Sequence, residues 1–523
     1  MKRLCSMLIA AFALAASAAT AQTPERVDIL IRNGIVIDGS GGPRRNADVG
    51  IVGDRIVLIG DGAGVRAGRT IDADNMIVAP GFIDPHTHSL RDLRADDASR
   101  RRVLNHLTQG VTTILVGNDG DGGYEIEAMR AELQRLRIGV NAGSFVGFGT
   151  VRRAVVGEED RAPTDEELAR MRQLVAGAMC EGAFGFSAGL YYAPQSFSET
   201  EEVIALAREA AIRGGIYESH LRSEGVGNSR LFNAVEEALR IGREADMPVH
   251  IAHIKASGRD TRREAARVID RIEVERAAGR QVTADQYPWR ASGTRVSNAL
   301  MPRWTQDGGS AAMRQRLADP ALQEQLRNEI GRLIRGRGGP EALLITTGEH
   351  RGRYLHQAAE AMGVDPVEAA RRIALNGDAR LASFTMHEED IRAFMRQPWV
   401  VTSSDATTGH PRRFGTFPSK FALYVRETPL LTPEEFVHRS AGLTAEIFGI
   451  AERGVLREGY FADVVVIDPR SFAARADYAN PEEYSVGVLY AIVNGELAID
   501  RATATNRLAG RPLTKTPSPG SCG

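Results

Sequence analysis

The stretch Ala79-Pro80-Gly81-Phe82-Ile83-Asp84-Pro85-His86-Thr87-His88-Ser89 decides how the rest of the chain is interpreted. An apolar run typical of a buried strand ends here in two histidines separated by one residue. Alternate side chains of a strand share a face, so His86 and His88 point the same way and Thr87 points the opposite way. Two imidazoles at the end of a strand form half of a metal site. The competing interpretation is a chance pair of surface histidines, and the remaining sequence has to decide between the two.

Length and composition restrict the class of protein. The chain has 523 residues, of which 25% are charged, and its formal net charge is -2. This length allows two or three domains, or one large barrel with additions. The balanced charge does not indicate nucleic acid or an acidic membrane surface as a partner. The 54 glycines and few aromatic residues favour a loop-rich α/β enzyme over a coiled coil or a disordered chain.

The first 21 residues have the pattern of a secretory signal peptide. Lys2 and Arg3 give the positive start, residues 7–16 give an apolar core, and Ala19-Thr20-Ala21 gives a small-residue cleavage site. No later run reaches the roughly 18 apolar residues that a membrane-spanning helix needs. We therefore predict cleavage after Ala21 and an exported protein without membrane insertion, periplasmic in a Gram-negative host.

Two cysteines, Cys180 and Cys522, remain after this cleavage. Cys522 lies in a segment rich in proline, serine and glycine, and we predict residues 511–523 to be a flexible tail. The two cysteines could pair, but we do not expect a disulfide, because two cysteines do not make a disulfide scaffold.

Both ends of the chain have the pattern of β structure. Residues 22–78 and 455–510 consist of short alternating runs broken by glycine, with a hairpin signal at Asn494-Gly495. We predict that the two segments meet and build one small β-sandwich domain.

The segment between them, residues 79–454, alternates strand-like and helical runs, as expected of βα units with a parallel sheet. The candidate strands cover residues 77–83, 112–116, 141–147, 183–186, 215–219, 249–253, 282–285 and 399–402. Eight such units predict an α/β protein with a (β/α)8 TIM-like barrel. Residues 290–349 are too long for one crossover, and we interpret them as a mostly helical insertion over the barrel mouth.

The ends of the candidate strands carry further metal-ligand residues. Barrel enzymes place their catalytic residues at the carboxyl ends of the strands. His220 ends the fifth candidate strand, and Asp405 follows the eighth. On the sixth, His253 and Lys255 share one face, whereas His250 lies on the other and is interpreted as a packing residue. Five ligand-type residues in this register, counting the first pair, predict a metal centre.

Several stretches in order along the chain carry a family resemblance. They include Gly110-Val111-Thr112-Thr113, Ser219-His220-Leu221-Arg222-Ser223-Glu224, Val282-Thr283-Ala284-Asp285-Gln286-Tyr287-Pro288, His410-Pro411-Arg412 and Gly415-Thr416-Phe417-Pro418. Together with the opening stretch they resemble the metal-dependent amidohydrolase superfamily, and within it the N-acyl-D-amino-acid deacylases (D-aminoacylases). The resemblance spans nearly all of the predicted mature chain.

The resemblance implies one or two zinc ions. It assigns His86, His88 and Asp405 to one metal position, and His220 and His253 to a second. The family takes its ligand after the second strand from a cysteine, whereas this chain has Asp119 in the turn Gly117-Asn118-Asp119-Gly120. An aspartate can ligate or bridge zinc, and its oxygen suits manganese or another hard divalent metal better than sulfur does. The alternative is that Asp119 only stabilises the turn.

The chemistry of such a centre gives the remaining residues their expected roles. A divalent ion lowers the pKa of bound water from ~15.7 to about 7, and Asp405 can take the proton and pass it to the leaving amine. Lys255, Tyr287 and Arg412 are candidates for binding the α-carboxylate of the substrate. Arg295 would favour D-glutamate or D-aspartate derivatives if the insertion presents it to the substrate; otherwise it is a solvated arginine.

We therefore predict hydrolysis of the amide bond of N-acyl-D-amino acids as the function. The alternatives are a dipeptidase for peptides with a C-terminal D-residue, a cyclic-amide hydrolase of the hydantoinase type, and a homologue that binds without a metal. In each enzymatic case the partner is a small molecule.

Overall fold

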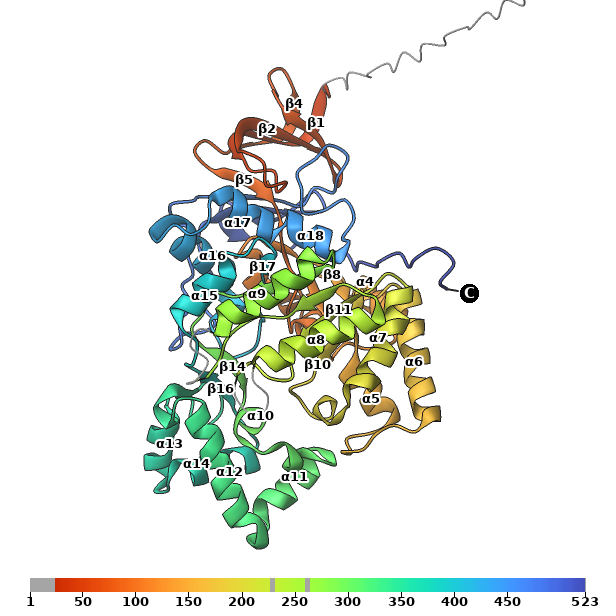
Figure 1. Ribbon diagram of the computed structural model, residues 1–523. Helices are drawn as coiled ribbons and strands as arrows, with labels where there is room; N and C mark the ends of the chain where they lie inside the picture. Colours follow the sequence, from red (N-terminus) through yellow and green to blue (C-terminus); the bar gives the residue numbers. More distant parts are fainter. Residues whose placement is uncertain (1–23, 226–230, 259–263, 523) are drawn as a thin grey trace, which may run out of the picture.

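The computed structural model describes residues 24–225, 231–258 and 264–522 (Figure 1). The predicted signal segment, residues 1–21, lies outside the described residues. In Figure 1, a sheet made from the start and the end of the chain lies at the top, an α/β region lies in the middle, and a helical lobe lies at the bottom. Among the described residues, no helix combines the length and the apolar character needed to cross a membrane.

Parallel strands form the centre of the α/β region. One sheet has six strands in the order β17-β13-β12-β11-β10-β9, and a second has three in the order β6-β7-β8. The two sheets approach each other at both ends. Only Phe145 separates β8 of the smaller sheet from β9 of the larger one. At the other end, Thr87 after β6 forms a parallel bridge with Ala406 after β17. Each predicted strand region overlaps at least one of these strands. The strands are β6 (Phe82–Asp84), β7 (Val111–Val116), β8 (Asn141–Ser144), β9 (Val146–Gly147), β10 (Gly185–Gly189), β11 (Ile216–His220), β12 (Val249–Ile251), β13 (Val282–Gln286) and β17 (Val400–Thr402).

Helices pack around these strands. The longest, α6 (Asp165–Cys180), begins at a capping box in which Thr164 and Glu167 satisfy each other's backbone N–H groups. Apolar faces of α6 to α9 pack on β10 to β13 and form the largest core cluster. Each fully buried aliphatic or aromatic side chain of this kind contributes about 1.5–3 kcal/mol. The other helices of this region are α1 (Leu90–Leu93), α2 (Ala98–Arg101), α3 (Leu104–Leu107), α4 (Ile126–Leu136), α5 (Phe148–Val155), α7 (Thr200–Ile212), α8 (Leu231–Ala245), α9 (Glu264–Ala277), α15 (Glu388–Met395), α16 (Arg412–Phe421), α17 (Pro433–Ser440) and α18 (Gly442–Phe448).

Both ends of the chain contribute to one sheet of nine strands, in the order β21-β20-β19-β18-β5-β1-β2-β3 with β4 on β1. The two ends join where β18 pairs with β5 in antiparallel orientation. The predicted hairpin at Asn494-Gly495 connects β19 to β20. The strands are β1 (Arg26–Val36), β2 (Arg45–Val52), β3 (Arg55–Gly60), β4 (Arg66–Asp72), β5 (Ile77–Pro80), β18 (Val464–Ile467), β19 (Val488–Val493), β20 (Glu496–Asp500) and β21 (Thr503–Ala504).

The insertion is mostly helical, as predicted, but it is longer than predicted and also contains a small antiparallel sheet. It does not end at residue 349, because β16 (Arg380–Ser383) pairs in antiparallel orientation with both β14 (Ser292–Arg295) and β15 (Leu343–Ile345). These long-range pairings close a lobe with its own apolar core. The helices of this lobe are α10 (Val296–Leu300), α11 (Gly309–Ala318), α12 (Gln323–Gly336), α13 (Leu355–Met362) and α14 (Pro366–Leu375).

The prediction of a free, flexible tail is wrong. Backbone N–H groups of the last segment donate to the α/β region, Leu513 to the Ala142 carbonyl at 2.7 Å and Lys515 to the Gly182 carbonyl at 3.0 Å. Cys522 forms a disulfide with Cys180 at the end of α6, contrary to our expectation. The two cysteines are 342 positions apart in the sequence, which explains why no local pattern indicated the pair.

Candidate metal centre

The carboxyl ends of β6, β7, β11, β12 and β17 bring all six predicted metal-ligand residues together. His86 and His88 follow β6, Asp119 follows β7, His220 ends β11, and His253 and Asp405 lie just beyond β12 and β17. Five of the six side chains are buried, and His88 is partly exposed. His86 and His88 point to the same side, as the alternation of a strand predicts. The hydroxyl of Thr87 between them turns away and donates to the Leu115 carbonyl at 2.8 Å.

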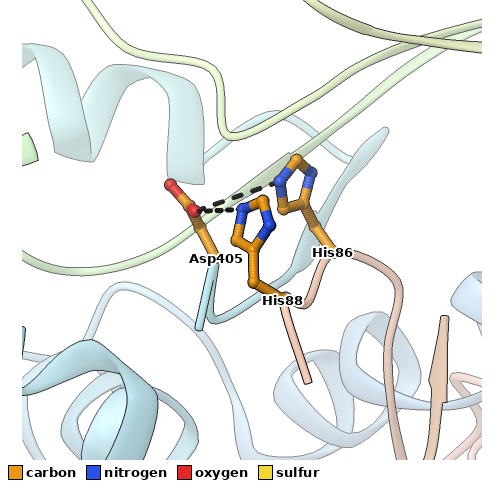
Figure 2. Close-up of side chains that lie close together, drawn as sticks. All are labelled: His86, His88 and Asp405. Carbon is orange, nitrogen blue, oxygen red and sulfur yellow. Dashed lines mark ion pairs between the residues drawn. The ribbon is translucent and has the colours of Figure 1, made fainter. Parts of the chain in front are cut away.

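One group of ligand atoms consists of His86, His88 and Asp405 (Figure 2). Oδ1 of Asp405 lies 3.4 Å from Nε2 of His88 and 4.0 Å from Nε2 of His86. Figure 2 shows both imidazole rings facing this carboxylate. Nitrogen and oxygen atoms at these separations can share one ion at the usual ligand distances of about 2.0–2.2 Å.

A second group consists of His220, His253 and Asp119. Nδ1 of His220 lies 2.9 Å from Nε2 of His253, and each nitrogen lies 3.6 Å from Oδ1 of Asp119. These three atoms form a compact triangle with the dimensions of three ligands of one tetrahedral site.

Asp119 lies between the two groups. Besides its contacts to the second group, Oδ1 is 3.4 Å from Nε2 of His86, and Oδ2 is 3.5 Å from Nε2 of His88. The aspartate therefore faces four histidines and does more than stabilise a turn. Its backbone has a φ of +58°, and its carbonyl accepts a hydrogen bond from Gln195.

The residues fit a zinc ion or a similar divalent cation. Nε2 of His86 and Oδ1 of Asp119 are buried and have no hydrogen-bond partner among the described residues, which is costly for polar atoms unless another ligand satisfies them. The backbones of Asp119, His253 and Asp405 all have positive φ, at +58°, +34° and +45°. Left-handed backbone at non-glycine residues costs about 1–3 kcal/mol and is typical of functional sites.

The electrostatics support the same conclusion. Burial alone would raise the pKa of Asp119, but His86 and His220 hold it well below its usual range. Burial likewise raises the pKa of Asp405, but Arg412 and the neighbouring histidines together lower it well below its usual range. Burial lowers the pKa of His88, whereas Asp119 and Asp405 raise it to about 10. Ionised carboxylates among buried imidazoles form a site that favours an added positive charge.

Two glutamates that the sequence interpretation did not assign lie next to the histidines, and one of them, Glu224, forms a further ligand-type group with His220 and His253. Glu218 is fully buried on β11, and its Oε1 lies 2.9 Å from Nδ1 of His86. Glu224 lies 3.2 Å from Nδ1 of His253. Glu218 precedes His220 by two positions and so shares the ligand face of β11. That alternation was the signal available in the sequence, but only the fold places the carboxylate against His86.

Hydrogen bonds of Asn118 and of the buried Asp285 hold in place the backbone segments that carry the ligand histidines. Asn118 donates to the Pro85 carbonyl at 2.9 Å and accepts from the Thr87 N–H at 3.2 Å. Asp285 accepts from the His253 N–H at 2.8 Å and from Nε2 of His250 at 2.9 Å. Thus His250 is a supporting residue away from the ligand cluster, as predicted.

The predicted carboxylate-binding residues also come together. Arg412 lies over the ring of Tyr287 at 4.7 Å, and Lys255 lies 5.5 Å from the same ring. Arg412 contacts Oδ2 of Asp405 at 2.8 Å, and the amine of Lys255 contacts Glu224 and Nδ1 of His253. Arg295 is separate from this group and lies at the end of β14 in the lobe.

A cavity of about 1400 Å³ connects the ligand cluster to the lobe. Its wall includes His88, Asp119 and Asp405 on one side and Arg295 and Arg380 on the other. The site is thus accessible to a molecule considerably larger than water.

Comparisons with known proteins identify the family of the chain. Residues 69–295 and 321–499 match the amidohydrolase family. A D-aminoacylase from Alcaligenes xylosoxydans xylosoxydans is 35% identical over 521 residues, covering 94% of this chain and 98% of that protein. An N-acyl-D-glutamate deacylase from the same organism is 32% identical over 520 residues, with the same two coverages. The crystal structure of N-acyl-D-glutamate deacylase from Bordetella bronchiseptica, complexed with zinc and a phosphonate mimic of the tetrahedral intermediate, superposes with a TM-score of 0.80 at 32% identity, covering 94% of this chain and 100% of that chain.

Proposed function

Because this chain belongs to the amidohydrolase family, we propose that it is a metal-dependent hydrolase that cleaves the amide bond of N-acyl-D-amino acids. One observation carries this proposal: four histidines and two aspartates from five strand ends converge at the end of one large cavity. The deacylase relatives, which align over nearly the whole chain, supply the substrate class.

Zinc is the metal that the donor set and the relatives support. His86, His88 and Asp405 would hold one ion, His220 and His253 a second, and Asp119 would contribute an oxygen to either or both. Since all these donors are nitrogen or oxygen, manganese is the next candidate. When bound, zinc held by these residues would supply Lewis-acid polarisation of the amide carbonyl and a more acidic water.

Asp405 is the proposed general base and acid. Its low pKa keeps it ionised at neutral pH, so it can accept a proton from the attacking water and pass it to the leaving amine. Oδ1 faces the histidines, while Arg412 holds Oδ2 at 2.8 Å. The arginine thereby fixes the orientation of the carboxylate.

Arg412, Lys255 and Tyr287 are the proposed site for the α-carboxylate. Nε and Nη1 of Arg412 and the hydroxyl of Tyr287 are buried and lack hydrogen-bond partners among the described residues. Leaving a buried donor without a hydrogen bond costs free energy. A planar carboxylate can accept two parallel hydrogen bonds from an arginine and so remove this cost.

A dipeptide with a C-terminal D-residue is the second candidate substrate. The cavity of about 1400 Å³ has room for an aminoacyl group in place of a small acyl group, and its wall is rich in charged side chains. Both substrates would present the same D-residue to the same carboxylate site.

Export is the proposed location, with the signal peptide removed after Ala21. The disulfide between Cys180 and Cys522 supports it, because disulfides persist mainly in oxidising compartments such as the periplasm. Detection of the mature protein only in the cytosol of its host would contradict this proposal.

We further infer that residues 79–454 close into a (β/α)8 barrel, and that residues 22–78 and 455–510 form a sandwich. Counting β8 and β9 as one strand gives eight parallel strands, and the Thr87–Ala406 pairing supports closure. For the sandwich, one apolar cluster combines side chains of β1 to β5 with those of β18 and β19. An experimental structure with an open edge at β17 would contradict the barrel.

Hydrolysis of a matched panel tests the function. Zinc-loaded protein is assayed with N-acetyl-D-methionine, N-acetyl-L-methionine and an L,D-dipeptide. We expect hydrolysis in the D series and a loss of about 10²–10⁴-fold in kcat for Asp405→Asn. Asp319→Asn, an exposed aspartate of the lobe, is the control and should match the native enzyme. Preference for the L series, or full activity of Asp405→Asn, would contradict the proposal.

A further inference from the structure

Two arginines face each other across the small sheet of the lobe. Arg295 on β14 pairs directly with Arg380 on β16 in antiparallel register. Side chains of such a pair share one face, with Cβ atoms about 4.5–5.5 Å apart, and like charges in this position are destabilising. Both arginines line the cavity that leads to the ligand cluster. A bound anion would therefore offset the repulsion between the two guanidinium groups.

The protein itself supplies little negative charge to this pair. Arg295 has one carboxylate nearby, Asp378 at 3.8 Å. That carboxylate already accepts hydrogen bonds from Ser297, through N at 3.1 Å and Oγ at 2.7 Å, and from the Ala379 N–H at 2.9 Å. Arg380 is half-buried and makes no salt bridge with any described residue.

The surroundings of Arg380 add more positive charge. Burial lowers the pKa of Arg380, and the positive charges of Arg295 and Arg412 lower it further, while Tyr192 and Asp405 oppose this effect. Arg380 therefore lies within electrostatic range of both the proposed α-carboxylate site and the catalytic aspartate. Arg295 and Arg380 on the cavity wall, with the positive charge of the buried Arg412 nearby, form a strong local attraction for anions.

The spacing along β14 relates the pair to the α-carboxylate site. Arg412 donates to the Gly293 carbonyl at 3.4 Å, so β14 begins beside that site. Arg295 is two residues further, on the same face and about 7 Å along the strand. This separation suits a molecule with two carboxylates a few bonds apart, one at each position.

We propose that Arg380, with Arg295 beside it, binds a second carboxylate on the side chain of the D-residue, so that acidic N-acyl-D-amino acids are the preferred substrates. This inference rests on the proposed deacylase function and adds a specificity-determining residue to it. Arginine suits the role because its planar guanidinium binds a carboxylate bidentately and stays charged at any working pH.

Matched substrates measure the contribution of the charge. The zinc-loaded enzyme is assayed with N-acetyl-D-glutamate and N-acetyl-D-glutamine, which differ in charge but hardly in shape. We expect kcat/KM for the glutamate derivative to fall about 10- to 100-fold in Arg380→Gln, with little change for the glutamine derivative. Arg380→Lys, which keeps the charge, should retain part of the preference. Arg314→Gln removes an exposed arginine from another part of the same cavity wall and should leave both values unchanged.

A binding measurement keeps the test independent of catalysis. Calorimetric titration of the zinc-loaded protein with the products D-glutamate and D-glutamine should show tighter binding of D-glutamate, and Arg380→Gln should abolish the difference. Selective binding of D-glutamate without hydrolysis of any N-acyl-D-amino acid would overturn the deacylase function and leave the anion site standing.

Three results would overturn the inference. The first is equal affinity of the native protein for D-glutamate and D-glutamine. The second is an equal loss for both N-acetyl substrates in Arg380→Gln, which would place the arginine on the α-carboxylate. The third is a fall in kcat/KM of Arg380→Gln that affects N-succinyl-D-methionine but not N-acetyl-D-methionine. This result would show that Arg380 binds the acyl group.

Discussion

Oε1 of Glu218 lies 2.9 Å from Nδ1 of His86, and both side chains are fully buried. A negative charge this close to Nδ1 favours the tautomer with the ring proton on Nδ1, which leaves the lone pair on Nε2, the nitrogen nearest Asp119 and Asp405. Partners of this kind orient metal-binding histidines and increase their basicity.

Glu218→Gln should therefore weaken zinc retention by about 10- to 100-fold, because the neutral amide can present the wrong hydrogen-bonding group to Nδ1. Competition with a chromogenic chelator measures the affinity. Glu202→Gln is the matched control, since Glu202 forms a buried pair with Arg152 away from the ligand cluster. It should reduce thermal stability without changing zinc affinity. Equal zinc affinity in native and Glu218→Gln protein would contradict this role.

Asp119 should set the preference between metals. Asp119→Cys replaces the hard oxygen with a soft thiolate and should raise the ratio of bound zinc to bound manganese. Asp119→Ala should lower the total metal content, because it leaves His220 and His253 without their third ligand. Elemental analysis after equilibration with equal concentrations of both metals measures the ratio. An unchanged ratio in Asp119→Cys would show that Asp119 does not ligate.

The disulfide should stabilise the fold without affecting catalysis. Cys180→Ser and Cys522→Ser each remove the bond and should lower the free energy of unfolding by about 2–4 kcal/mol. The double variant should be no less stable than either single one, since one bond is lost in all three. Thermal unfolding measures the stability, and limited proteolysis should cut residues 513–522 faster in the variants. Additive losses in the double variant would contradict this account.

Lys420 should make stability depend on pH. It is buried, donates to the Thr402 hydroxyl at 2.9 Å, and burial, with Arg439 nearby, lowers its pKa from 10.5 to about 7. Between these two values the unfolded chain binds a proton that the folded protein does not, so stability rises with pH by up to about 1.4 kcal/mol per unit. Lys420→Met should remove this rise. Melting temperatures of both proteins from pH 7 to 9.5 test it, and parallel curves would exclude a contribution from Lys420.

The sequence alone located most of the metal centre because the relevant signals are local. His86 and His88 share a face through the period of a strand, and Asp405 follows an apolar run that we predicted to be a buried strand. The same local signals placed the central strands and the hairpin at Asn494-Gly495. Each depends on residues a few positions apart, which propensity and alternation determine directly.

Tertiary structure decided the contacts between residues far apart in the chain. The approach of Glu218 to His86 depends on how β11 lies relative to β6, and the position of Asp119 between four histidines depends on the turn after β7. The Arg295–Arg380 pair exists only because β16 returns across 85 positions to a specific register on β14, and the disulfide joins cysteines 342 positions apart. No short-range pattern encodes such pairings, because the packing of the whole chain fixes them.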